Sequence, residues 1–107
     1  MNKILNNLFK LPKLPIKEER FDKLLEKEGI LIERIISTGQ VSPPGFWYNQ
    51  DQDEWVVLIQ GIAELEFEDG KKVRLTKGDY VLCPKNLRHR VTYTSVEPAC
   101  IWLAVHF

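Results

Sequence analysis

The sequence contains few cysteines, no formal net charge and no long apolar run. It has two cysteines, Cys83 and Cys100, and each lies inside an apolar stretch with the composition of a strand. Because no secretory signal precedes them, we expect two reduced, buried thiols and no disulfide. Fifteen Lys and Arg residues balance fifteen Asp and Glu residues. This balance argues against a nucleic-acid-binding protein, which usually carries a basic excess.

No segment predicts a membrane span or a secretory signal. The first fifteen residues, MNKILNNLFKLPKLP, are too short and too interrupted for either role. We therefore expect a cytoplasmic protein with no membrane partner. The formal net charge of zero weakens repulsion between copies, so charge does not oppose self-association.

Length and composition predict one globular domain of 107 residues, in which residues 1–29 form an arm and a short helix. The apolar residues near the start could dock onto the domain: Ile4, Leu5, Leu8 and Phe9. In residues 18–28, EERFDKLLEKE, apolar side chains recur at helical spacing, and Gly29 follows as a stop. We expect this helix to pack on a barrel formed by residues 30–107.

Residues 30–107 have the pattern of an all-β domain. Residues 54–60 are nearly all apolar, as in a strand buried on both faces, whereas residues 63–68 alternate apolar and acidic side chains. Asp69-Gly70 predicts a hairpin turn. Other strand-like runs occupy residues 30–38, 71–76, 80–83, 89–94 and 99–107. Turns at a spacing of about 8–12 residues indicate a sandwich or barrel.

Two spacings in this region are specific. Six residues separate Glu54 from Gly61, five separate Gly78 from Pro84, and four separate Pro84 from His89. The stretch GDYVLCPKNLRHRV resembles the second motif of the cupin superfamily, and Glu54 with Gly61 resembles the end of the first. The resemblance extends to small single-domain bacterial cupins and covers residues 30–107. It implies a cupin-type double-stranded β-helix, or jelly-roll barrel, with a pocket at one mouth.

The resemblance also implies a metal site of three histidines and one glutamate, most of which is missing here. The two first-motif histidines are replaced by Tyr48 and Gln50, or by Trp47 and Asn49 if the spacer is one residue longer. Amide and phenol oxygens replace imidazoles poorly at neutral pH, so we expect a degenerate first metal motif. The candidate ligands for a divalent transition metal are Glu54 and His89, followed by Gln50, Tyr48 and His106.

The expected pocket is built around Glu54 and His89. Strand alternation places Arg88 and Arg90 on the face opposite His89, which favours a contact between Glu54 and His89. Such a pair could act as a general acid–base couple or as an inert polar anchor. We expect His106 to bind a carbonyl or to face solvent, and its approach to the pocket along the Trp102 face is the alternative.

Four other residues carry expectations. Trp47 and Tyr48 should point to opposite faces, and core or interface packing is favoured for each over a ligand wall. Asn86 replaces the second-motif glycine and can keep its turn, because Asn tolerates left-handed backbone. Cys83, next to Pro84, is expected to pack in the core.

Three functions remain open. The first is a cupin-fold protein of unassigned activity that binds a small molecule in the pocket of Tyr48, Gln50, Glu54 and His89. The second is a metal-dependent enzyme of the isomerase, lyase, decarboxylase or dioxygenase type, with Glu54 and His89 as catalytic candidates. The third is a structural or protein-interaction module. The resemblance further implies a homodimer.

Overall fold

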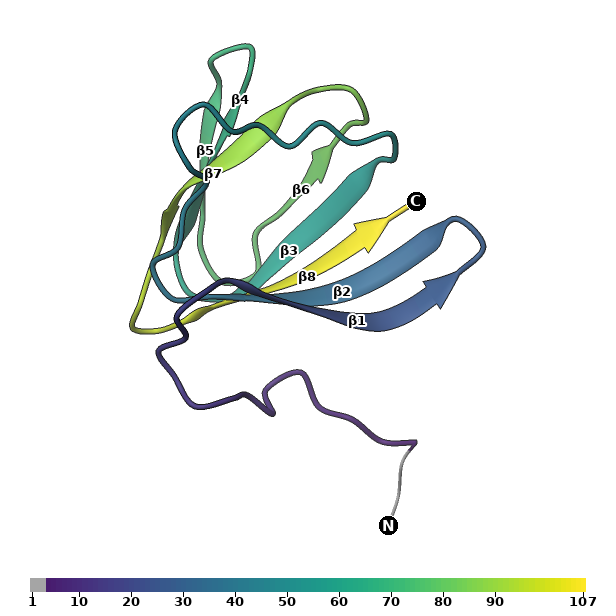
Figure 1. Ribbon diagram of the computed structural model, residues 1–107, viewed down its shortest axis with the longest axis vertical. Helices are drawn as coiled ribbons and strands as arrows, with labels where there is room; N and C mark the ends of the chain where they lie inside the picture. Colours follow the sequence, from purple (N-terminus) through teal and green to yellow (C-terminus); the bar gives the residue numbers. More distant parts are fainter. Residues whose placement is uncertain (1–3) are drawn as a thin grey trace.

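The computed structural model describes residues 4–107, and these form two antiparallel sheets (Figure 1). The strands are β1 (Arg20–Lys27), β2 (Ile30–Ser37), β3 (Glu54–Gln60), β4 (Ala63–Phe67), β5 (Lys72–Leu75), β6 (Tyr80–Cys83), β7 (His89–Thr94) and β8 (Cys100–His106). One sheet has the order β1-β2-β8-β3-β6, and the other has the order β5-β4-β7. None of the described residues forms a helix that is long and apolar enough to cross a membrane.

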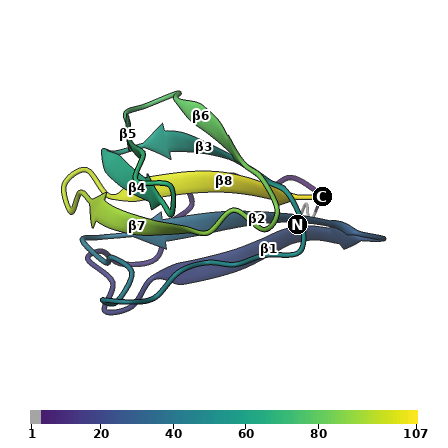
Figure 2. The ribbon, with the colours of Figure 1, turned by 90° about the horizontal axis from the view of Figure 1, so that it is seen from above.

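The two sheets lie opposite each other and enclose the core (Figure 2). The most deeply buried side chains come from both sheets and include Leu58, Ala63, Leu65, Trp102 and Ala104. Both cysteines are buried and free, as predicted. The strands between residues 30 and 107 follow the alternation in the sequence, so the all-β barrel is confirmed.

Two turns explain why the motif positions need unusual backbone. Gly61 joins β3 of one sheet to β4 of the other with a φ of 100°, and a Cβ there would lie 2.9 Å from the Cα of Cys100. Only glycine fits this close approach without strain. Asn86 has a φ of 68°, which confirms that it keeps the turn of the glycine it replaces.

The predicted helix at residues 18–28 is wrong, because β1 occupies most of this segment and pairs with β2. A bulge between Lys23 and Leu25 shifts the register, so Phe21 pairs with Ile35 on one face and Leu25 pairs with Ile32 on the other. The spacing that resembled a helix therefore belongs to a bulged strand. Gly29, expected as a helix stop, lies in the β1–β2 hairpin with a φ of 76°.

The arm before β1 runs outside the barrel (Figure 1). Arg34 holds it, since its Nη1 donates to the carbonyl of Leu8 at 2.8 Å and to that of Lys10 at 2.9 Å. Ile4, Leu5 and Phe9 remain 93%, 77% and 51% exposed. The arm is thus fixed by its backbone, and the predicted docking of these three apolar side chains does not occur.

Candidate functional site

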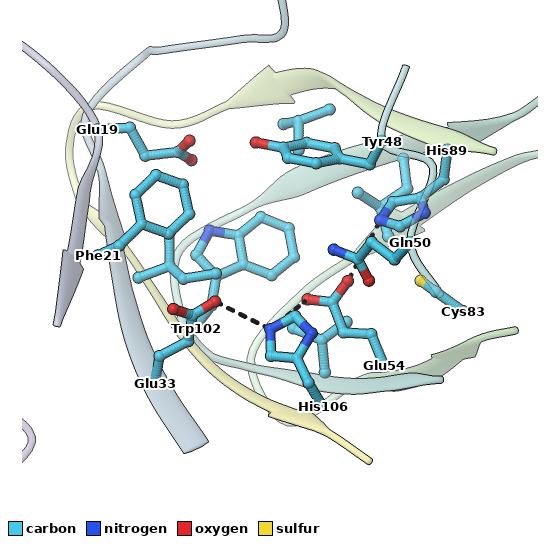
Figure 3. Close-up of a pocket in the computed structure, with 14 residues that line it drawn as sticks. Glu19, Phe21, Glu33, Tyr48, Gln50, Glu54, Cys83, His89, Trp102 and His106 are labelled. Carbon is cyan, nitrogen blue, oxygen red and sulfur yellow. Dashed lines mark hydrogen bonds and ion pairs between the residues drawn. The ribbon is translucent and has the colours of Figure 1, made fainter. Parts of the chain in front are cut away.

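A pocket lies between the two sheets and is surrounded by side chains from seven of the eight strands (Figure 3). Its volume is about 80 Å³. A buried water needs at least about 10–15 Å³ by the same kind of measure, so this space holds several waters or a small organic molecule. All four predicted pocket residues, Tyr48, Gln50, Glu54 and His89, line it.

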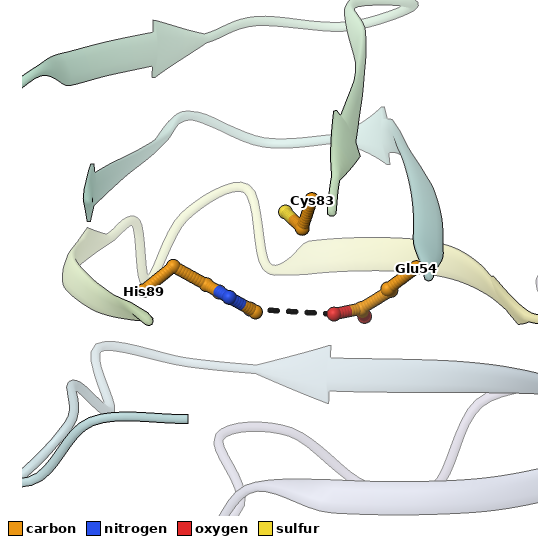
Figure 4. Close-up of side chains that lie close together, drawn as sticks. All are labelled: Glu54, Cys83 and His89. Carbon is orange, nitrogen blue, oxygen red and sulfur yellow. Dashed lines mark ion pairs between the residues drawn. The ribbon is translucent and has the colours of Figure 1, made fainter. Parts of the chain in front are cut away.

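Glu54 and His89 meet in this pocket, as predicted (Figure 4). Glu54 begins β3 and His89 begins β7, so the two facing sheets each supply one partner. Oε1 of Glu54 lies 3.3 Å from Nε2 of His89, and the two side chains are only 9% and 7% exposed. Backbone hydrogen bonds of 2.7 and 3.1 Å tie His89 to Tyr48, whose ring stacks on the imidazole.

Neither arginine beside His89 lines the pocket, as strand alternation predicted for both Arg88 and Arg90, and Arg90 points outward. Its Nη2 lies 2.6 Å from Glu66, and its guanidinium sits 4.6 Å from the centre of the Trp47 ring. Trp47 therefore faces outward while Tyr48 faces inward, which confirms their opposite orientation. Of the described residues, those that line the pocket include no Lys or Arg.

His106 enters the same pocket, so the expected carbonyl or solvent contact is wrong and the alternative is correct. Its Nε2 lies 2.9 Å from Oε1 of Glu33 and 3.9 Å from Oε2 of Glu54. The hydrogen bond with Glu33 raises the pKa of His106, burial opposes this, and the charge of Glu54 adds to it. A positively charged His106 would be held between two carboxylates.

Tyr48 forms part of the pocket wall, although core or interface packing was favoured for it. Its only strand-like pairing in the described chain is a single bridge with His89. Burial raises the pKa of Tyr48 to about 12, with further contributions from Glu19, Glu54 and Glu33. The phenol stays protonated at neutral pH, which makes it a poor metal ligand.

Four pocket residues with polar or aromatic side chains were not predicted, Glu19, Phe21, Glu33 and Cys83, and Trp102 was placed there only in the alternative for His106. Glu19 and Phe21 were missed because their segment was assigned to a helix. Glu33 was missed because its contact with His106 depends on the β2–β8 register, which joins residues far apart in the sequence. One sequence signal could have placed Glu33 in the pocket. In β2, residues 31, 33 and 35 share one face, and they pair with residues 106, 104 and 102 of β8.

Cys83 completes a group of three possible metal donors with Glu54 and His89. Their ligand atoms all lie within 4.8 Å of one another, and all three residues are buried. Two ligands about 2.0–2.1 Å from a tetrahedral ion lie about 3.3 Å apart, which matches the Glu54–His89 distance. These donors could hold a metal ion, whereas the imidazole of His106 lies outside the group.

Two features of this group weaken its hold on a metal. Burial and then the charge of Glu54 raise the pKa of the Cys83 thiol to about 12, so the thiolate forms only if an ion displaces the proton. Nδ1 of His89 has no hydrogen-bond partner in the described structure. Metal-binding histidines usually donate that second nitrogen to a neighbour, which orients the ring.

Similar proteins support the fold and the family. A proposed mannose-6-phosphate isomerase of Ralstonia eutropha JMP134 is 45% identical, with a TM-score of 0.91 and 95% of each chain covered. An RmlC-like cupin family protein of Methanocaldococcus jannaschii is 19% identical, with a TM-score of 0.69 over 90% of this chain and 85% of that chain. At this identity the second likeness shows the fold alone.

Among curated proteins, the RCS-specific HTH-type transcriptional activator RclR of Escherichia coli K12 is 40% identical over 47 residues. The matched segment is 44% of this chain and 16% of that relative. The family model for the cupin domain matches residues 33–106. Because that match covers most of the chain, including Glu33, Glu54, Cys83, His89 and His106, this protein belongs to the cupin family.

Proposed function

We propose that this cupin binds a small organic molecule in its barrel pocket. The observation that carries the proposal is a pair of pocket-lining groups with no hydrogen-bond partner, Nδ1 of His89 and Nε1 of Trp102. A buried polar group without a partner costs about 1–3 kcal/mol. A ligand that pairs with these two atoms would recover that free energy.

The pocket has the composition expected for such binding. Apolar and aromatic side chains, including Phe21, Val56 and Leu65, form much of the wall, and a few polar groups converge on the space between them. Glu54 would accept a hydrogen bond from the ligand, while His89 could donate or accept depending on its tautomer. These two residues would fix the orientation of the molecule.

A metal-dependent enzyme is the second candidate, favoured by the donor group of Glu54, Cys83 and His89. A divalent ion bound there would supply a Lewis acid. Without it, Glu54 and His89 could still pass a proton between two positions of a bound molecule, which is the chemistry that an isomerase needs. The likeness to the proposed Ralstonia isomerase supports this candidate, whereas the likeness to RclR, a regulator, is compatible with binding alone.

Elemental analysis and a binding screen test the two candidates together. Protein is purified without a His-tag and without chelator, and the indole N–H signal of Trp102 is followed by NMR while a library of small polar molecules is added. We expect little bound metal and several molecules that shift this signal. Trp102→Phe identifies the signal by removing it.

Two variants locate the binding. Glu54→Gln removes the carboxylate charge inside the barrel, and Glu66→Gln does the same on the outer side, where Glu66 pairs with Arg90. Binding should be lost in the first and kept in the second. If no molecule shifts the Trp102 signal in the unmodified protein, the proposed function is wrong. Near-stoichiometric metal that disappears in Cys83→Ser would establish the metal centre.

A further inference from the structure

The pocket carries more negative than positive charge. Three carboxylates line it, those of Glu19, Glu33 and Glu54, against the two imidazoles of His89 and His106. One of these imidazoles, that of His106, already lies 2.9 Å from Glu33. With no Lys or Arg among the described lining residues, the balance stays negative even when His106 is protonated.

Glu19 is the carboxylate with the weakest compensation. Its Oε2 accepts a hydrogen bond of 2.8 Å from the hydroxyl of Ser37, and the described residues offer it no cationic partner. Burial raises the pKa of Glu19, the Ser37 hydrogen bond opposes this, and the charge of Glu33 adds to it. Glu19 is partly buried, so its unpaired charge carries a desolvation cost that a bound cation would relieve.

Aromatic rings surround the space in front of this carboxylate. Phe21 follows Glu19 on the same wall, and Tyr48 and Trp102 lie across the pocket from it (Figure 3). Ring faces attract cations, most strongly that of tryptophan. The walls therefore favour the same sign of ligand charge as the carboxylates do.

Trp102 adds a second, independent requirement. The residue is only 3% exposed, lines the pocket, and its Nε1 has no hydrogen-bond partner among the described residues. An indole N–H can only donate, so it needs an acceptor atom. A protonated amine has no free lone pair, so the acceptor must come from another group of the ligand, such as a hydroxyl oxygen.

We propose that the pocket selects a small organic cation that also carries a hydroxyl group, that is, an amino alcohol of a few heavy atoms. Its ammonium group pairs with Glu19, and its hydroxyl oxygen accepts from Nε1 of Trp102. The inference rests on the proposed function, because it names the ligand class of the same pocket.

The same charge balance disfavours phosphorylated ligands. Proteins bind phosphate with Arg, Lys or backbone N–H groups, and Arg and Lys are missing from the described lining of this pocket. A divalent ion on Glu54, Cys83 and His89 would not reverse the balance, since the carboxylate and thiolate together cancel its charge. A sugar phosphate, the substrate class named for the Ralstonia relative, is therefore a poor fit to this pocket.

Three probes of nearly equal length test the charge preference: 3-amino-1-propanol, 1,3-propanediol and 3-hydroxypropanoate. Each is titrated into the unmodified protein at pH 7 and constant ionic strength, and the Trp102 indole N–H signal is followed by NMR. We expect the amine to bind at least tenfold more tightly than the diol. The carboxylate, and mannose 6-phosphate in a parallel titration, should cause no saturable shift.

Glu19→Gln and Glu18→Gln form a matched pair of variants. Glutamine keeps an oxygen for the Ser37 hydroxyl but removes the charge, while Glu18 is an exposed neighbour that does not line the pocket. We expect Glu19→Gln to weaken amine binding at least tenfold and diol binding by much less, so that the preference for the amine is lost. Glu18→Gln should alter neither.

The outcomes separate this inference from the proposed function. Equal or tighter binding of the diol or the carboxylate would overturn the preference for a cation while leaving a ligand-binding pocket. The preference is overturned in the same way if the library screen yields ligands but all three probes fail to bind. If the library also yields none, both proposals fail. The probe comparison needs no variant, so poor folding of Glu19→Gln would not leave the inference untested.

Discussion

Each of the two faces of the five-stranded sheet departs from the usual pattern of antiparallel sheets. The inner face packs on the apolar core but also carries the titratable residues Glu33, Glu54 and His106, which line the pocket. The outer face carries an apolar row across five strands, whose register is Leu25, Ile32, Val105, Trp55 and Leu82. An ordinary sheet of this type turns apolar residues inward and polar residues outward. Polar groups inside and apolar groups outside are what the proposed polar ligand and a covering partner would each require.

Strand β3 shows how one segment serves both faces. Glu54 and Val56 line the pocket, while Trp55 alternates with them and contacts the Tyr80 ring of β6 at 5.4 Å. This alternation explains why a carboxylate opens a strand of otherwise apolar composition. Its carboxyl group is enclosed by the facing sheet, and the apolar residues on either side belong to two different environments.

Arg34 is a buried cation on the outer face, and its removal should have the largest effect. It is buried, and it binds the Asp22 carboxylate at 2.7 Å as well as two carbonyls of the arm. Arg34→Met leaves the two arm carbonyls without this donor and Asp22 with the exposed Arg20 as its remaining cation, so we expect a loss of about 3 kcal/mol in the free energy of unfolding. Urea denaturation measures it.

Arg20 provides the control for that experiment, because it contacts the same Asp22 but its side chain is 49% exposed. Exposed ion pairs contribute at most about 1 kcal/mol, so Arg20→Met should be much milder. Equal losses in the two variants would show that the arm adds nothing to the stability of the barrel.

The apolar row should be covered by a second copy of the chain. Leu82 and Tyr80 on this face are 50% and 68% exposed in the single chain, and a net charge of zero does not oppose pairing. We expect a homodimer whose dissociation constant rises roughly thirtyfold, about 2 kcal/mol, in Leu82→Lys. Analytical ultracentrifugation measures it.

Val96→Lys is the matched control, since Val96 is 51% exposed but lies between β7 and β8, outside the apolar row. It should leave the dimer unchanged. If the chain is monomeric at all micromolar concentrations, no dimer covers the apolar row. If the two variants weaken the dimer equally, the dimer interface is not the apolar row.

On the inner face, Glu19→Gln should raise the stability of the ligand-free protein by about 1 kcal/mol at pH 7, because it removes a desolvated charge. Since burial raises the pKa of Glu19 in the folded chain, the folded state binds its proton more tightly than the unfolded state. In the wild type, the free energy of unfolding should therefore fall as the pH rises from the ordinary carboxyl range through the raised pKa of Glu19. Denaturation at several pH values should show that slope in the wild type and a smaller one in the variant. A less stable variant at pH 7 would mean that Glu19 is structural.

Much of the barrel could be predicted because its signals are local. The spacing of Gly61, Gly78, Pro84 and His89 identified the cupin motifs, and alternation placed His89 inward and Arg90 outward. The prediction for residues 18–28 was wrong because a bulged strand, such as β1, and an amphipathic helix can place apolar residues at the same intervals. Only pairing with β2 distinguishes them, and pairing is a tertiary property.

The site could be predicted only in part, for a related reason. The face of His106 was correctly grouped with that of Trp102, but its partner Glu33 depends on which residues of β2 and β8 lie side by side. Cys83 lies directly opposite Glu54 across the β3–β6 pair, and that register placed a sulfur among the donors. Motif spacing carries no information on either contact.

The smallest effect is expected at Tyr48, where Tyr48→Phe removes only a hydroxyl from the inner wall. The phenol, with a pKa raised to about 12, stays protonated at neutral pH. Phenylalanine keeps the ring that stacks on His89. We expect less than a threefold change in amino alcohol binding and a change in stability below about 0.5 kcal/mol. NMR titration measures the binding and urea denaturation measures the stability. A tenfold loss of binding would show that the Tyr48 hydroxyl contacts the ligand directly, and that Glu19 is not its main polar contact.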